Sequence, residues 1–161
     1  MSSLLGYRLV KQKWSALAFD GEGAKRYGGR WNSRGKPCVY LAGSESLAML
    51  EILVHVDNYQ ILQHYALFQL PLLPKDVLYV DTTTLPNAWR EDPAPPETAE
   101  IGDAWLADAA SLVLAVPSVI VPREWNFILN PTHPRFAAVV QKAVKLDFEP
   151  DRRLLSKPPK T

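Results

Sequence analysis

A single carboxylate inside an apolar helical segment is the most informative feature of the sequence. Glu51 lies in the run SLAMLEILV, residues 46–54. Ser44 is suited to cap a helix that we predict to open at Gly43-Ser44 and to run to about Val56. A carboxylate on an otherwise apolar face is rarely buried without a partner or a chemical task. For Glu51 alone, an ion pair with a surface Arg or Lys explains the pattern equally well.

Three other side chains could share chemistry with Glu51. Arg30 follows a Gly-Gly turn on a predicted strand with Trp31, and Tyr40 lies on a short predicted strand over residues 38–41. Ser118 follows Pro117 at a bend between predicted strands 112–116 and 119–121, because proline interrupts strands. Two adjacent strands and a packed helix would bring Arg30, Tyr40 and Glu51 to one cleft. Taken singly, Arg30, Tyr40 and Ser118 are better explained as a surface cation, a core residue and a turn residue, and only their combination favours a site.

The elements that must position these residues mix strands and helices without a regular βαβ order. Residues 7–10 predict a first strand, on which Arg8 is either solvated or lines the same cleft as Arg30. Further predicted strands cover 61–70 and 77–80, a helix begins at Pro96, and Asn130-Pro131 marks a turn. Residues 136–148 suit either a helix or a strand, and the charged, Pro-rich tail 151–161 is expected to fray. This order predicts an α+β fold with a largely antiparallel, bent sheet and flanking helices.

Composition excludes several classes of protein. The chain has 161 residues, 47% of them hydrophobic, and a net charge of +1, which suits one domain and gives no basic footprint for nucleic acid. One cysteine, Cys38, excludes an internal disulfide framework and suits the cytoplasm. The three histidines have no metal-ligand spacing, and no apolar run approaches the length of a membrane span. We therefore expect a cytoplasmic protein without a metal centre, a signal peptide or a membrane segment.

Several stretches in chain order carry a family resemblance. They are residues 7–9, 28–32 with 35–37 and 39–40, 46–55, 116–118 and 126–134. Together they resemble the RES-domain family, the toxins of RES–Xre toxin–antitoxin pairs. The family takes its name from an Arg, a Glu and a Ser, which match Arg30, Glu51 and Ser118. The resemblance predicts a single RES domain over residues 1–161, with a core of about 7–154.

The resemblance implies an ADP-ribosyltransferase-like fold that binds NAD, as substrate, in a cleft. Family members cut the nicotinamide–ribose bond and pass ADP-ribose to inorganic phosphate or to water, and a few modify a protein. The implied partner is an antitoxin with an Xre-type helix-turn-helix domain, which covers or enters the cleft. The sequence leaves open the acceptor, the oligomeric state (a homodimer included) and the antitoxin segment that blocks the cleft.

The chemistry expected of these residues follows from the leaving group. Nicotinamide leaves as a neutral molecule from a cationic ring, so one carboxylate suffices, whereas ordinary glycosidases need two. Glu51 would hydrogen-bond the ribose hydroxyls and stabilise the oxocarbenium-like transition state. Arg30 offers a planar fork for a pyrophosphate or an incoming phosphate, and Arg8 is a second candidate for the same anion.

The remaining predicted site residues would contact other parts of NAD. Tyr40 would offer its ring to nicotinamide, and Ser118 would contact the ribose or fix Glu51. Asn130 completes the predicted NAD-binding set of Arg8, Arg30, Tyr40, Ser118 and Asn130.

Two other functions compete with NAD depletion. One is ADP-ribosylation of a protein. Transferases of that kind usually place an acidic residue or Gln two positions before the key Glu, and here that position is Met49. This weighs against modification of an Arg side chain. The other is a non-enzymatic domain that binds a partner through the Pro-rich loop 92–96 and several tryptophans.

Overall fold

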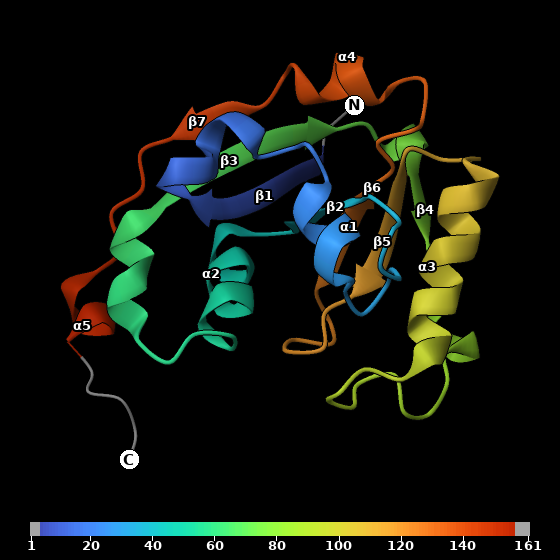
Figure 1. Cartoon of the computed structure of the whole chain (residues 1–161), viewed down its shortest axis with the longest axis horizontal. Helices are drawn as coiled ribbons and strands as arrows, with labels where there is room; N and C mark the ends of the chain where they lie inside the picture. Colours follow the sequence, from blue (N-terminus) through green and yellow to red (C-terminus); the bar gives the residue numbers. More distant parts are fainter. Residues whose placement is uncertain (1–3, 157–161) are drawn as a thin grey trace.

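The structure, a computed structural model, describes residues 4–156. Its strands are β1 (Leu4–Lys11), β2 (Val39–Ala42), β3 (Tyr65–Leu72), β4 (Val77–Tyr79), β5 (Val113–Pro117), β6 (Trp125–Leu129) and β7 (Val144–Leu146). In this part of the chain they form a seven-stranded sheet in the order β4-β5-β6-β2-β1-β3-β7 (Figure 1). Neighbouring strands are antiparallel except β4 and β5, which are parallel. The predicted α+β fold with a largely antiparallel sheet is confirmed.

The α-helices and short 3-10 helices connect and flank these strands. The α-helices are α1 (Glu22–Tyr27), α2 (Glu45–Leu53), α3 (Pro96–Asp108), α4 (Phe136–Val140) and α5 (Arg152–Leu155). The 3-10 helices are η1 (Gln12–Leu17), η2 (Tyr59–His64), η3 (Pro74–Asp76) and η4 (Thr82–Thr84). Among the described residues, no helix combines the length and the apolar character needed to cross a membrane.

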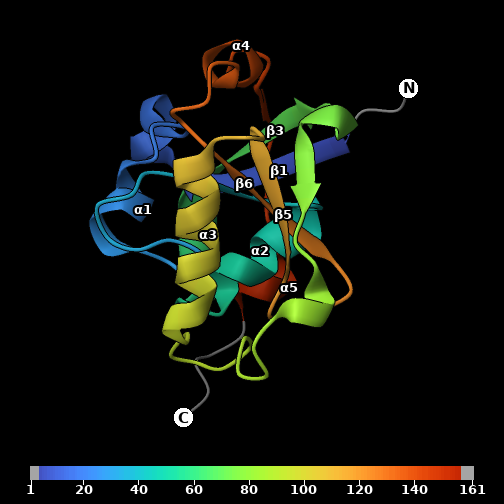
Figure 2. The ribbon, with the colours of Figure 1, turned by 90° about the vertical axis from the view of Figure 1, so that its right-hand side faces the viewer.

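The two faces of the sheet are covered by different helices. On one face, α2 packs Leu47 and Ala48 against Leu9 and Ala42, and α3 packs Trp105 beside Ile128. The opposite face carries Val39, Leu41, Leu70 and Leu129, with Val139 of α4 packed against them. Figures 1 and 2 both show α4 at one end of the molecule and α2 well away from it. The functional residues expected on the α2 face are therefore separated from α4 by the sheet.

The helix that carries Glu51 begins where the sequence predicts it. Ser44 is its N-cap, and the Ser44 hydroxyl accepts a hydrogen bond from the backbone N–H of Leu47 at 3.1 Å. The helix ends at Leu53, three residues before the predicted end. Glu51 consequently lies in its last turn, close to the end of the element.

Three predicted strand segments need correction, one of them at both ends. Arg30 and Trp31 lie in a turn with an isolated bridge between Gly29 and Asn32. Residues 61–64 belong to η2, because Asn58 caps that turn by accepting from the N–H of Gln60. Residues 119–121 bend instead of extending, since the Ser118 side chain accepts two of their backbone N–H groups. β3 continues through Pro71 to Leu72. Pro71 lies opposite Leu5 of β1, and the missing N–H of a proline does not prevent this pairing.

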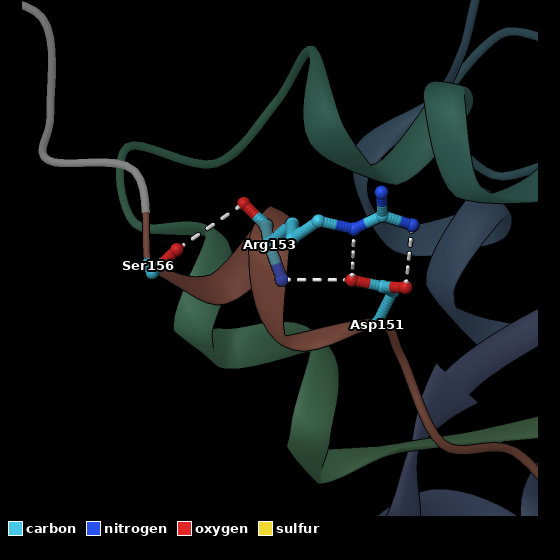
Figure 3. Close-up of polar contacts among 3 residues, drawn as sticks. All are labelled: Asp151, Arg153 and Ser156. Carbon is cyan, nitrogen blue, oxygen red and sulfur yellow. Dashed lines mark hydrogen bonds and ion pairs between the residues drawn. The ribbon is translucent and has the colours of Figure 1, made fainter.

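The C-terminal part resolves the open alternative. Residues 136–148 form both a helix, α4, and a strand, β7. Asp151 caps α5 by accepting from the N–H of Arg153, and it also pairs with the Arg153 guanidinium at 3.0 Å (Figure 3). The predicted frayed tail is therefore ordered into a short helix over Arg152–Leu155. Residues 157–161 of that tail lie outside the described residues.

Candidate active site

Glu51 is held by two uncharged donors that come from two neighbouring strands. The Ser118 hydroxyl donates to Glu51 Oε1 at 3.1 Å, and Asn126 Nδ2 donates to the same oxygen at 2.7 Å. Ser118 directly follows β5, and Asn126 lies within β6. The hydrogen bonds of the described residues leave Glu51 Oε2 unused. The carboxylate is thus anchored through one oxygen and presents the other.

The orientation of the Ser118 hydroxyl is fixed by its surroundings. Ser118 is fully buried, and its Oγ accepts hydrogen bonds from the backbone N–H groups of Ile120 and Val121, each at 3.1 Å. With both lone pairs occupied, the single hydroxyl hydrogen is directed to Glu51. The bend after Pro117 therefore makes Ser118 a donor to the carboxylate. This agrees with one of its two predicted roles, that of fixing Glu51.

Asn126 is the site residue that the sequence reasoning missed. It pairs with Ala42 of β2 and with Val116 of β5, so its side chain leaves the sheet on the face that α2 covers. A polar residue within the apolar strand WNFIL was the available signal, of the same kind that marked Glu51. Its meaning depended on α2 packing opposite β6, which the local pattern does not reveal.

Arg30 lies within electrostatic reach of this carboxylate. Partial burial lowers the pKa of the Arg30 guanidinium, while the charges of Asp92 and Glu51 act to raise it. Its Nη1 donates to the carbonyls of Trp89 and Glu91, both at 2.8 Å. These bonds leave Nε and Nη2 of the fork for an anion.

The loop over residues 86–95 connects Arg30 to the strand end that carries Ser118. Arg90 in this loop donates through Nε and Nη2 to the carbonyl of Val119, at 3.2 and 2.9 Å. The same loop accepts the two bonds from Arg30. The backbone on both sides of the carboxylate is thereby tied to one segment.

The turn that carries Arg30 is set by α3. Gly102 of α3 meets the backbone of Trp31 so closely that a Cβ at position 102 would clash with the Trp31 carbonyl oxygen. Asp103 accepts from the Ser33 N–H at 2.9 Å and from the Ser33 hydroxyl. Position 30 is therefore fixed by residues some seventy positions later, and this explains why local reasoning predicted a strand there.

Tyr40 supports the same turn. Its hydroxyl donates to Asn32 Oδ1 at 2.7 Å and accepts from the Trp31 N–H at 3.3 Å. Burial raises the pKa of Tyr40 well above its usual value. The ring shares the face of the sheet with Asn126, because Tyr40 pairs with Ile128 two residues further along β6. The structure thus brings Tyr40 beside Arg30, while its hydroxyl points to Asn32.

Two predicted NAD-binding residues lie elsewhere. Arg8 leaves the sheet on the face opposite to Tyr40, because Tyr7 is the β1 residue that pairs with Ala42. Its guanidinium donates to the carbonyls of Ala18 and Tyr40, at 2.6 and 2.9 Å. Burial lowers the pKa of Arg8. The geometry does not place Arg8 in a cleft with Arg30.

Asn130 has a structural setting. Its Nδ2 donates to the Leu106 carbonyl at 3.1 Å, and its Oδ1 accepts from the N–H and hydroxyl of Thr132. These bonds join the end of β6 to α3. NAD binding by Arg8 and Asn130 stays a prediction that these contacts do not support.

Two surface hollows have linings that do not include Glu51. One, of about 420 Å³, lies along residues 56–64, and the other, of about 320 Å³, lies between Leu4 and Phe127. Among the described residues, no group of three or more His, Cys, Asp or Glu side chains is placed to hold a metal ion. The candidate site is therefore defined by the hydrogen bonds around Glu51.

Comparison with known proteins places this arrangement in a family. A solved structure, the M. tuberculosis MbcT–MbcA toxin–antitoxin complex, matches the fold with a TM-score of 0.61 and 20% sequence identity. The match covers 90% of this chain and 85% of that one. The model of the RES domain matches residues 6–151. The chain belongs to the RES-domain family, as its sequence resemblance predicted.

Curated relatives match over most of their length. The protein named Toxin Res from Yersinia enterocolitica is 43% identical over 148 residues, which are 92% of this chain and 97% of that protein. Toxin Res from Photorhabdus laumondii is 42% identical over 149 residues, 92% of this chain and 96% of its own. The Prs ADP-ribosylating toxin of Sphingobium sp. strain YBL2 is 34% identical over 135 residues, 82% of this chain and 84% of its own.

Proposed function

We propose that this chain is the toxin of a toxin–antitoxin pair and that it depletes NAD by cleaving the nicotinamide–ribose bond. The observation that carries the proposal is the anchored Glu51 with its free oxygen, within electrostatic reach of Arg30. Membership of the RES-domain family and the relatives named Toxin Res support the toxin role. The reaction would take place in the cytoplasm, where NAD is the substrate and no bound cofactor is needed.

The chemistry breaks one bond and forms another. The C–N bond between ribose and nicotinamide breaks, and its electron pair neutralises the positive charge of the ring, so neutral nicotinamide leaves. Glu51 stabilises the positive charge that develops on the ribose, and Oε2 binds the neighbouring hydroxyls. Water then adds to give ADP-ribose and a proton, or inorganic phosphate adds to give ADP-ribose 1″-phosphate.

The other residues bind and orient NAD. Arg30 contacts the pyrophosphate or the incoming phosphate through the fork atoms that the loop carbonyls leave unused. Tyr40 contributes its ring to the nicotinamide side and holds the turn of Arg30 in place. Ser118 acts through Glu51, because its hydroxyl is already directed to that carboxylate.

The proposed partner is an antitoxin that covers the site. The similar solved structure is that of a toxin–antitoxin complex, which supports a protein partner. From the family resemblance, we propose that this partner carries an Xre-type helix-turn-helix domain. It would inhibit by denying NAD access to Glu51 and Arg30.

Protein ADP-ribosylation is the second candidate, because one relative is named Prs ADP-ribosylating toxin. The same cleavage would then transfer ADP-ribose to a side chain of a target protein. Met49, two residues before Glu51, offers no polar contact to an Arg acceptor. The two candidates share Glu51 and differ in the acceptor.

The test follows the products of NAD with the purified protein and a Glu51→Gln variant, with and without phosphate. We expect NAD loss with the wild type alone. ADP-ribose 1″-phosphate identifies a phosphorylase, and free ADP-ribose in both buffers identifies a hydrolase. Intact NAD in both buffers overturns the proposal and leaves modification of a protein target, or a binding domain whose expression without antitoxin does not arrest growth.

A further inference from the structure

Asn126 combines a short bond to Glu51 with an unsatisfied oxygen. Its Nδ2 lies 2.7 Å from Glu51 Oε1, closer than the Ser118 hydroxyl at 3.1 Å. Its Oδ1 is buried and has no hydrogen-bond partner among the described residues. Buried polar atoms without partners are uncommon and often mark functional sites.

The unsatisfied oxygen is a consequence of the carboxylate. If the amide were turned by half a rotation, Oδ1 would face the negative Glu51 oxygen and repel it. The orientation that directs N–H to Glu51 therefore leaves Oδ1 unpaired. The fold retains a buried acceptor without a partner, and what it gains is a donor directed to Glu51.

Two donors from two strands restrict how the carboxylate can turn. Ser118 comes from the end of β5 and Asn126 from within β6, and both donate to Oε1. A carboxylate held at one oxygen from two sides keeps its second oxygen in one direction. Neither donor carries a charge, so the negative charge of Glu51 is not cancelled by an ion pair.

We propose that Asn126 is a positioning residue for Glu51: its amide holds Oε1 so that Oε2 is presented to the ribose hydroxyls of NAD. The proposal rests on the proposed NAD cleavage and adds a residue to it. Asn126 acts through Glu51 and does not itself contact the reacting carbon. Its removal therefore lowers kcat more than it raises KM for NAD.

The sheet offers a matched control in Gln69. Asn126, Ala42, Tyr7 and Gln69 form one row across β6, β2, β1 and β3. Gln69 also uses its amide, donating to the Tyr7 hydroxyl at 3.0 Å. Three strand spacings separate it from Asn126, a distance of about 14 Å. Gln69→Ala removes a comparable amide bond on the same face without touching Glu51.

The first measurement is nicotinamide release by the wild type, Asn126→Ala and Gln69→Ala. We expect Asn126→Ala to lower kcat on the order of 10- to 100-fold with KM changed less than about threefold, because orientation is lost and binding is kept. Gln69→Ala should retain wild-type kcat. A kcat for Asn126→Ala within twofold of the wild type, or an equal loss in Gln69→Ala, overturns the proposal.

The second measurement is the pH profile of Asn126→Asp. A protonated Asp in place of Asn126 can donate to Glu51 as the amide does. The two adjacent carboxyl groups would share this proton, and the repulsion between two ionised carboxylates raises the pKa at which it is lost. We expect the activity of Asn126→Asp relative to wild type to be highest at acidic pH and to fall as the pH rises, when both acids ionise and repel. Arg30, whose guanidinium interacts electrostatically with Glu51, is unchanged in all these variants. An Asn126→Asp profile parallel to that of Asn126→Ala contradicts positioning by a donor.

A third measurement separates the bond from the activity. In urea unfolding, each single variant, Glu51→Ala and Asn126→Ala, should lower the urea concentration at the midpoint. The double variant should lower it by less than the sum of these two decreases, because both single changes break the same hydrogen bond. Additive losses overturn the proposal. If the wild type cleaves no NAD, the proposed function fails and the role in cleavage falls with it, while non-additive midpoints still establish the bond.

Discussion

Two acidic side chains, Glu51 and Asp76, each have partners on one oxygen only, and those partners are of opposite kinds. Asp76, at the end of η3, is 7% exposed, and its Oδ1 pairs with Arg135 Nη1 at 2.8 Å. Asp76 Oδ2 is buried and has no hydrogen-bond partner among the described residues. Glu51 accepts instead from the uncharged Ser118 and Asn126. The first carboxylate is paired with a cation, whereas the two hydrogen-bond donors of the second are uncharged.

The difference fits a structural role for Asp76 and the catalytic role proposed for Glu51. The Asp76–Arg135 pair joins the start of β4 to α4 at the end of the molecule that lies far from α2 (Figure 1). A carboxylate that is already paired with a cation adds little attraction for a positive ribose. In the proposed reaction, Glu51 supplies that attraction from a rigid anchor, because its dipolar partners Ser118 and Asn126 need no rearrangement.

Removing the charge of Glu51 is the change with the largest expected effect. Glu51→Gln should lower NAD cleavage on the order of 10³-fold, since a neutral amide no longer stabilises the developing positive charge. The Gln oxygen still accepts from Ser118 and Asn126, so the free energy of unfolding should change by less than about 1 kcal/mol. Nicotinamide release and urea unfolding measure the two quantities. Full activity with a neutral residue 51 would remove the distinction between the two carboxylates.

The same substitution at the other carboxylate should give the reverse result. Asp76→Asn should lower the free energy of unfolding by about 2 kcal/mol, less than for a fully buried pair because the Arg135 side chain is 41% exposed. NAD cleavage should stay within about twofold of the wild type because the pair lies outside the site. Urea unfolding and the same kinetic assay test this. A large loss of kcat in a stable Asp76→Asn protein would show that the two regions are coupled.

Ser118, which is buried, and Ser111, which is partly buried, allow a comparison of two hydrogen-bonded hydroxyls. Ser118→Ala should lower kcat about tenfold, because Glu51 loses one of two anchors, and destabilise by about 1 kcal/mol. Ser111 accepts from Trp105 Nε1 and donates to the Val113 carbonyl, at 2.8 and 3.1 Å, so Ser111→Ala should cost similar stability. Only the first variant should lose activity at a temperature where both are folded. Equal kinetic losses would assign Ser118 a structural role alone.

The smallest expected effect is a loss of stability at alkaline pH, caused by the Cys38 thiol at the edge of the site. Burial raises the pKa of Cys38 from 9.0 to about 12, so the folded state holds its proton to higher pH than the unfolded chain. Stability is then fully present below pH 9 and is lost as the pH rises toward 12, which amounts to about 1 kcal/mol between pH 8 and pH 9.5. Urea unfolding at these two values should show that loss in the wild type and a smaller one in Cys38→Ala. An equal loss in both proteins would assign the alkaline sensitivity to another group.

The sequence predicted the carboxylate and its hydroxyl partner because both break a local rule. Glu51 interrupts an apolar helix, and Ser118 follows a proline inside a β-rich segment. Such conflicts between a residue and its surroundings are visible without a structure. Asn126 breaks the same rule within β6, and its role depends on which helix covers that face.

Register and distant packing decided what the sequence could not show. Arg8 was expected near Arg30, yet the pairing of Tyr7 with Ala42 places the Arg8 side chain on the opposite face. A shift of one residue in that pairing would reverse the outcome. The turn at Arg30 depends on Gly102 and Asp103 of α3, which no local pattern near position 30 contains.

The anchoring of Glu51 also dictates when the protein can become active during its synthesis. The Ser118 and Asn126 donors follow Glu51 by 67 and 75 residues. A nascent or prematurely terminated chain that ends before residue 126 carries the carboxylate without at least one of the two groups that hold it. For the proposed toxin, the ribosome must therefore translate past residue 126 before the anchored carboxylate can form, and a shorter fragment should lack activity.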